Sequence, residues 1–237
     1  MAAHGHFPCR VVRHRGARRM TLRVSRDGAR MTVPPRTSVR EIDAFLRDSS
    51  GWVAEQRARL GPPPAPLAEG DRLALLDGEL ELIVAPAARR TSVRRDGPRL
   101  VARMTPGGDL DGAVERWYRR EAAALLDART RTLAGRLGVE VAGVGIRDPR
   151  GRWGSCSSSG RLSFSWRLLL TPEAVLDYVV AHEVCHLVRP DHSRAFWALV
   201  EQVVPGFRGR RAWLREHGDR LHLGPAWRTA RATRPGG

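Results

Sequence analysis

The chain has 237 residues and a formal charge of +16, from 41 basic and 25 acidic residues. It contains no apolar run suited to a membrane span or a signal peptide, which predicts a cytoplasmic protein without a membrane partner. Its three cysteines are an odd number and lie far apart, which argues against a disulfide framework.

The first part of the chain, residues 1–108, has the pattern of a β-rich region. Alternating runs at 20–24 and 30–33, separated by an Asp-Gly pair, predict a β-hairpin. A capping-box pattern opens one predicted helix over residues 38–60, and a stiff proline-rich linker follows it. Two further Asp-Gly turns within residues 71–104 predict a small antiparallel meander.

Residues 109–223 are expected to form a second domain. An amphipathic pattern predicts a long helix over 112–137, stopped by a glycine, and then a strand over 139–147. Alternation at 161–166 predicts a strand with one apolar face, whose main-chain edge could hold an extended peptide. The tail, residues 224–237, is rich in Arg, Ala, Thr, Pro and Gly and is expected to be disordered.

A His-Glu-x-x-His motif within an apolar run is the most informative feature of the chain. The run predicts a buried helix over residues 172–188, with Thr171 as a hydroxyl N-cap. Pro190 must end this helix. His182 and His186 are four residues apart on it, so both rings project from one face.

The motif predicts zinc-dependent hydrolysis, because two imidazoles at this spacing can share one zinc ion. Glu183 projects beside the pair, where its carboxylate can act as the general base on the attacking water. Burying two histidines and an ionised glutamate would be costly without a partner. A bound cation is therefore favoured over a purely structural role.

His192 is the predicted third ligand. It follows His182 by ten residues, as in the extended zincin pattern, although Arg189 stands where that pattern has glycine. The rival is Glu201, since some zincins complete the site with a downstream carboxylate. His192 is favoured because it needs no long-range folding assumption. A thiolate from Cys156 is a further alternative.

Two side chains are candidates for stabilising a tetrahedral oxyanion. Tyr178 lies one turn before His182 on the same side of the predicted helix, and Arg152 lies upstream. Each also has a structural alternative, a packed helix aromatic for Tyr178 and a contact to a carboxylate or carbonyl for Arg152. The sequence leaves the choice open.

Several ordered segments together resemble the YgjP-like metallopeptidases, which are relatives of the SprT and WLM zincins. The segments are residues 18–24, 152–157, 166–168, 177–187, 192–197 and 205–218. The resemblance extends over about residues 8 to 218. One departure is Ser165, where the family often has asparagine.

The resemblance implies an α+β fold with a zincin-like catalytic domain, in which the active-site helix lies beside a mixed or antiparallel sheet. A smaller β-rich region precedes this domain. It also implies a zinc-dependent peptidase acting on peptide or protein substrates, with His182, His186 and His192 as Zn²⁺ ligands and Glu183 as the catalytic base.

The charge leaves a second kind of partner open. All 41 basic residues are arginine, and the chain has neither lysine nor asparagine, which indicates a GC-rich coding sequence. The net excess still predicts a positive field that attracts anionic partners such as nucleic acid. Aromatic residues are sparse among the arginine clusters, which favours solvated faces over a base-binding surface.

Two rival functions fit the same residues. One is a DNA-associated protease that the basic surface recruits to its substrates. The other is a non-catalytic zinc-binding module in which the three histidines stabilise the fold. The presence of Glu183 within the motif argues against the second.

Overall fold

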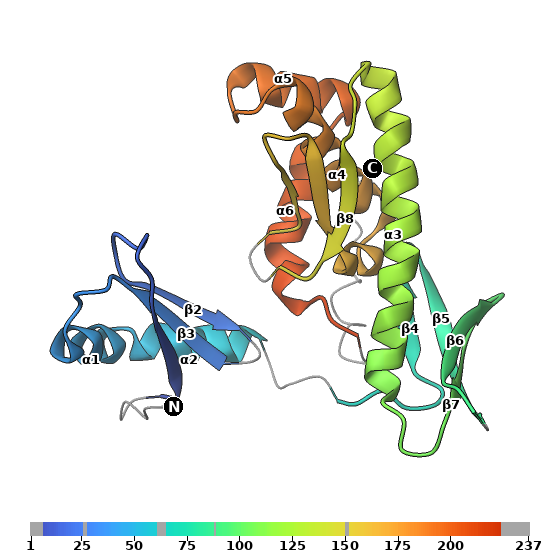
Figure 1. Cartoon of the computed structure of the whole chain (residues 1–237), viewed down its shortest axis with the longest axis horizontal. Coiled ribbons are helices and arrows are strands. Elements are labelled where there is room, and N and C mark those ends of the chain that lie inside the picture. Colours follow the sequence, from blue (N-terminus) through green and yellow to red (C-terminus); the bar gives the residue numbers. More distant parts are fainter. Residues whose placement is uncertain (1–6, 26–27, 61–64, 88, 150–151, 224–237) are drawn as a thin grey trace. The chain divides into compact units, whose positions relative to one another are not determined.

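The computed structural model of the chain (Figure 1) describes residues 7–25, 28–60, 65–87, 89–149 and 152–223. The chain divides into two compact units, Met1–Pro63 and Pro64–Gly237, and each has its own hydrophobic core. The sequence places the division after residue 108 instead. The strands between residues 72 and 104 belong to the second unit because their apolar side chains pack into its core. The predicted tail, 224–237, lies outside the described residues.

The first unit contains a three-stranded sheet. β2 (Thr21–Ser25) and β3 (Gly28–Val33) form the predicted antiparallel hairpin. β1 (Cys9–Arg13) pairs in parallel with the other side of β3. The sheet order is therefore β1-β3-β2.

Two helices follow, where the sequence predicts one. α1 (Val39–Asp48) begins with the predicted capping box, and α2 (Ser50–Leu60) follows it directly. Ser49 ends α1 with its backbone N–H donated to the Phe45 carbonyl. The break falls in a Ser-Ser-Gly run of poor helix formers, which explains why the helix does not continue.

The second unit opens with a four-stranded sheet of order β4-β5-β7-β6. Its strands are β4 (Arg72–Leu75), β5 (Gly78–Pro86), β6 (Ser92–Asp96) and β7 (Arg99–Met104). The pairs β4–β5 and β6–β7 are antiparallel as predicted, but β5 and β7 are parallel neighbours, so the sheet is not a simple meander. β7 takes the inner position because it buries two apolar residues, whereas β6 is mostly exposed and serves as the edge.

α3 (Leu110–Leu137) confirms the predicted long helix and connects the two sheets of this unit. Asp109 caps its start, and Gly138 ends it with a φ of 66°, in the left-handed region that favours glycine. The helix contacts β6 and β7 along one part of its length and β8 along another, as Figure 1 shows.

The second sheet of this unit is mixed, as predicted. Its strands are β8 (Gly143–Arg147), β9 (Gly154–Cys156) and β10 (Arg161–Ser165), in the order β8-β10-β9. β10 pairs in parallel with β8 and antiparallel with β9. The expectation that the strand at 161–166 offers a free edge is therefore wrong, because partners occupy both of its edges.

Helices form the rest of the second unit: η1 (Trp166–Leu170), α4 (Glu173–Val188), α5 (Arg194–Val203), α6 (Phe207–His217) and η2 (Gly218–Arg220). Thr171 does not cap α4, since its hydroxyl donates to the Leu168 carbonyl at 2.8 Å and closes η1. None of the helices in the described ranges has the length and apolar character needed to cross a membrane. The α+β class is confirmed.

Candidate metal centre

α4 carries two of the predicted ligands. His182 and His186 lie on the same side of this helix, with ring centroids 4.8 Å apart. The helix ends at Val188, and Arg189 follows with an extended backbone at a φ of −134°. This conformation does not require glycine, which explains why arginine is tolerated at this position. The Arg189 carbonyl lies 3.1 Å from His186 Nδ1.

His192 returns to α4 through a short ordered turn. Asp191 accepts a hydrogen bond from the backbone N–H of Ser193 at 3.3 Å. Ser193 then caps α5, accepting from the Phe196 N–H at 3.4 Å. His192 Nε2 lies 3.2 Å from His182 Nε2. The structure thus brings the three histidines together, with one donor atom from each within 4.8 Å of the others.

The chemistry of this donor set fits a divalent metal ion. A hydrogen bond to the Arg189 carbonyl puts the proton on Nδ1 of His186, which leaves the lone pair of Nε2 available. The Nε2 atoms of His182 and His192 can share a hydrogen bond when one of them carries the proton of a neutral imidazole, or both can turn their lone pairs to one cation. Burial, reinforced by His186, lowers the pKa of His182 to about 4, so this imidazole is neutral at neutral pH, which is the form that ligates a metal. Three imidazoles suit zinc.

Glu183 lies on α4 between the two histidines and is 5 % exposed. β9 packs against this helix, and Gly154 lies opposite the carboxylate. A Cβ at residue 154 would come within 2.6 Å of Cγ and Oε1 of Glu183, so only glycine leaves room for this side chain. Burial raises the pKa of Glu183 to about 7, although the Arg152 charge acts in the opposite direction.

β9 also presents main-chain groups beside Glu183. The Trp153 carbonyl accepts from the Ser165 N–H, and the Ser157 N–H donates to the Arg161 carbonyl, both at 2.9 Å. Backbone groups of an antiparallel strand alternate in direction. The N–H and C=O groups of Gly154 therefore point away from β10, towards the edge of β9 that pairs with no other strand among the described residues.

The structure places neither rival third ligand in the histidine group. Glu201 Oε1 accepts from the Gly206 N–H at 2.9 Å and so belongs to the turn between α5 and α6. Cys156 faces α4 from β9, where burial and the Glu183 charge raise the pKa of its thiol. Among the described residues, the metal-donor group consists of His182, His186 and His192.

The two oxyanion candidates have different surroundings. Tyr178 is 5 % exposed, and its ring stacks on Phe207 with centroids 5.8 Å apart. The ring also lies 6.0 Å from the His182 ring, so its position fits either of the two roles. Arg152 is exposed and lies close enough to Glu183 to lower its pKa.

Sequence reasoning assigned no role to two aromatic residues that support the histidines. Phe196 is fully buried, and its ring stacks on His186 at 4.4 Å and lies 5.0 Å from each of the other two histidines. Trp197 lies 5.6 Å from His182 and from His192. Both residues lie in the first turn of α5, just after its cap at Ser193 and close to His192. This closeness in sequence to the third predicted ligand is the signal that could identify them.

Ser165, the departure from the family pattern, has a local structural role. It is 1 % exposed and accepts a hydrogen bond from the backbone N–H of Arg167 at 3.3 Å. It thereby caps η1 at the end of β10.

Comparison with known proteins identifies a family over most of the chain. Residues 18–217 match the family model described as the YgjP-like metallopeptidase domain. Among solved structures, the chain is similar to the metallopeptidase zymogen of Pyrococcus abyssi abylysin, with 26 % identity and a TM-score of 0.35. That similarity covers 39 % of this chain and 92 % of the other. No curated protein matches.

Proposed function

The chain belongs to the YgjP-like metallopeptidase family, and from this membership we propose that it is a zinc-dependent peptidase with Glu183 as its general base. The observation that carries the proposal is the group formed by His182, His186 and His192, whose donor atoms lie within 4.8 Å of one another beside a buried carboxylate. Its substrates are peptides or proteins.

The three histidines would hold the ion through ring nitrogens. The carbonyl of Arg189 orients His186 for this by binding its other ring nitrogen. Phe196 packs against all three rings and restricts their rotation. Zinc, when bound, supplies a positive charge that polarises a peptide carbonyl and makes an attacking water more acidic.

Glu183 would take the proton of the attacking water on its carboxylate and pass it to the nitrogen of the leaving amine. Burial raises the pKa of Glu183 to about 7 in the metal-free protein, and a bound cation would act in the opposite direction and favour the ionised base. Gly154 holds open the space in which this carboxylate lies.

The open edge of β9 would bind the main chain of the substrate. An extended peptide can add to such an edge by backbone hydrogen bonding. Gly154 packs directly against Glu183, so a peptide paired with the outward N–H and C=O groups of Gly154 would run past the general base. This edge takes the role that the sequence suggested for the neighbouring strand.

Replacing Glu183 with glutamine tests the proposal. Glu183→Gln keeps the size of the side chain but removes the base, so the variant should bind zinc normally and hydrolyse peptides about 100- to 10,000-fold more slowly. Zinc content and cleavage of a peptide mixture are measured in parallel. Glu216→Gln, at an exposed position on α6, is the matched control and should behave as the wild type.

The same experiment separates the enzyme from a non-catalytic zinc module. A wild type that carries zinc and cleaves no peptide would support the module. A Glu183→Gln variant with full activity would instead show that the enzyme works without this base.

A further inference from the structure

A pocket of about 500 Å³ adjoins the candidate metal centre. It lies between α5 and α6, and its lining includes Arg194, Trp197, Glu201, Phe207, Arg208 and Arg211. Trp197 belongs to both sites, since its ring also lies 5.6 Å from the rings of His182 and His192. A substrate side chain close to the cleaved bond can therefore reach this pocket.

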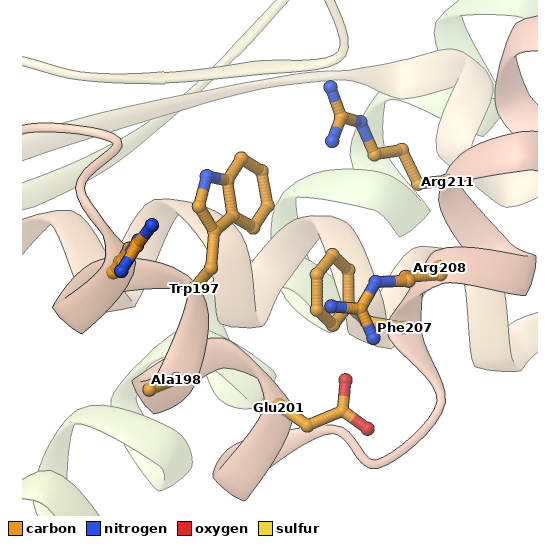
Figure 2. Close-up of a pocket in the computed structure, with 7 residues that line it drawn as sticks. Trp197, Ala198, Glu201, Phe207, Arg208 and Arg211 are labelled. Carbon is orange, nitrogen blue, oxygen red and sulfur yellow. The ribbon is translucent and has the colours of Figure 1, made fainter.

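Aromatic rings form one wall of the pocket and support its charged groups. Phe207 and Trp197 stack with centroids 5.2 Å apart and planes only 9° from parallel. The guanidinium carbon of Arg211 lies 4.9 Å from the centre of the Trp197 ring, and that of Arg208 lies 5.5 Å from the Phe207 ring. Figure 2 shows the Arg211 guanidinium beside the Trp197 ring and the Arg208 guanidinium beside the Phe207 ring. These contacts hold two cations at the pocket.

Within the described ranges, the arginines of the pocket have no acidic partner. Arg194, Arg208 and Arg211 are exposed, and none of them forms an ion pair with another residue in the described parts of the chain. A planar guanidinium binds a carboxylate through two parallel charge-assisted hydrogen bonds. The unpaired arginines therefore favour a ligand with a carboxylate over a neutral or basic one.

Glu201 opposes this charge but does not cancel it. Its Oε1 is already bound to the Gly206 N–H at 2.9 Å. Three arginines against one carboxylate leave the lining with a net positive charge. The N-terminal end of α6, at Phe207, adds to this positive charge through the helix dipole. It has no acidic residue in the first turn and no capping side chain.

We propose that this pocket binds a carboxylate of the peptide substrate close to the cleaved bond. The carboxylate belongs either to an acidic side chain or to the C-terminus of the peptide. This inference rests on the proposed peptidase function and adds the class of substrate to it. Trp197 lines the pocket and also lies beside the metal centre, so a carboxylate bound in the pocket has a fixed position relative to the cleaved bond.

The test is cleavage of a proteome-derived peptide library by the zinc-loaded full chain, with the products identified by mass spectrometry. Wild type should favour peptides with an acidic residue at one fixed position from the cleaved bond, or bonds at one fixed distance from the C-terminus. The first result assigns the pocket to a side chain and the second to the terminal carboxylate.

A double variant, Arg194→Gln with Arg208→Gln, connects the preference to the pocket. Both residues are exposed, so the fold should be kept, which the melting temperature checks. Synthetic peptide pairs, Glu against Gln or free acid against amide, should differ about tenfold or more in kcat/KM for wild type and much less for the variant. Arg215→Gln, exposed on α6 outside the pocket lining, is the control and should keep the preference.

The outcomes separate this inference from the proposed function. Cleavage without any preference for a carboxylate, or a preference that survives in the double variant, would overturn the inference and leave the peptidase standing. No cleavage of any peptide by wild type would overturn the proposed function, and with it the role of the pocket as a substrate site.

Discussion

Glu183 depends on a residue in another element for its position. Gly154 is the point at which β9 comes closest to the carboxylate, and any side chain there would occupy the space of Glu183. The His-Glu-x-x-His spacing identifies the base from local sequence, but it carries no information about which strand packs against it. Only the fold shows why glycine stands at residue 154.

Gly154→Ala should displace Glu183 while leaving the three histidines in place. We expect kcat to fall about 10- to 100-fold with unchanged zinc content, because a displacement of about 1 Å misaligns the base. Gly145→Ala is the control in the same sheet, since its Cβ would have Ser163 Oγ as nearest neighbour at 3.8 Å. Equal activity of Gly154→Ala and wild type would show that the close approach does not position the base.

The pKa of Glu183 predicts how the stability of the metal-free protein changes with pH. Burial raises this pKa from an ordinary 4.5 to about 7, so the folded state holds the proton more tightly than the unfolded chain. The contribution of Glu183 to the free energy of unfolding should therefore fall as pH rises from about 4.5 through about 7, whereas that of His182, whose pKa burial lowers from 6.5 to about 4, rises with pH. The protonated, neutral form is the one that burial tolerates.

Glu183→Gln removes this pH-dependent loss of stability, since glutamine carries no charge at any pH. The metal-free variant should gain stability relative to metal-free wild type by about 1 to 3 kcal/mol between about pH 5 and about pH 8. Denaturant unfolding of both proteins at the two pH values measures the difference. A stability difference that is independent of pH would mean that the carboxylate is not buried as described.

The helices and strands that have a local sequence signal can be predicted from the sequence. The β2–β3 hairpin, the capping box of α1, and α3 with its terminal glycine all follow from turn, cap or periodic patterns. Pairing between distant strands has no such signal, and the sequence missed both the parallel β5–β7 pair and the central place of β10. Thr171 was assigned to the wrong helix because hydroxyls can serve either of two adjacent helix ends.

The residues of the site likewise fall into those with a local sequence signal and those without one. The positions of His182 and His186 follow from the periodicity of one helix, and the ten-residue spacing from His182 favours His192 over Glu201 and Cys156 as the third ligand. Phe196 and the pocket behind Trp197 depend on how α5 and α6 pack, which local spacing does not encode.

His192 directly precedes Ser193, the N-cap residue of α5, so this cap should influence metal binding. Ser193→Ala removes the side chain that accepts from the Phe196 N–H and should cost about 1 kcal/mol of stability. Because His192 is the residue before this cap, zinc affinity should also fall several-fold in a chelator competition.

Ser38→Ala provides the control, since it removes the cap of α1 in the other unit. It should lower stability by a similar amount without changing zinc affinity. If the two variants retain zinc equally well, the turn before α5 does not position His192.

For the molecule as a whole, the candidate centre lies within one of the two units. All three histidines, Glu183 and the pocket belong to the unit that begins at Pro64. The family match spans residues 18–217 and therefore includes most of the other unit as well. The nucleic-acid partner suggested by the charge of +16 stays a prediction.

The measurement that tests this account most directly is the metal content of the full chain. Elemental analysis is made on protein purified without added metal and without a histidine tag. We expect about one zinc per chain, because the three histidines form a single donor group. Protein that carries no zinc and takes up neither zinc nor another divalent ion when it is added would contradict the metal centre and the hydrolase built on it.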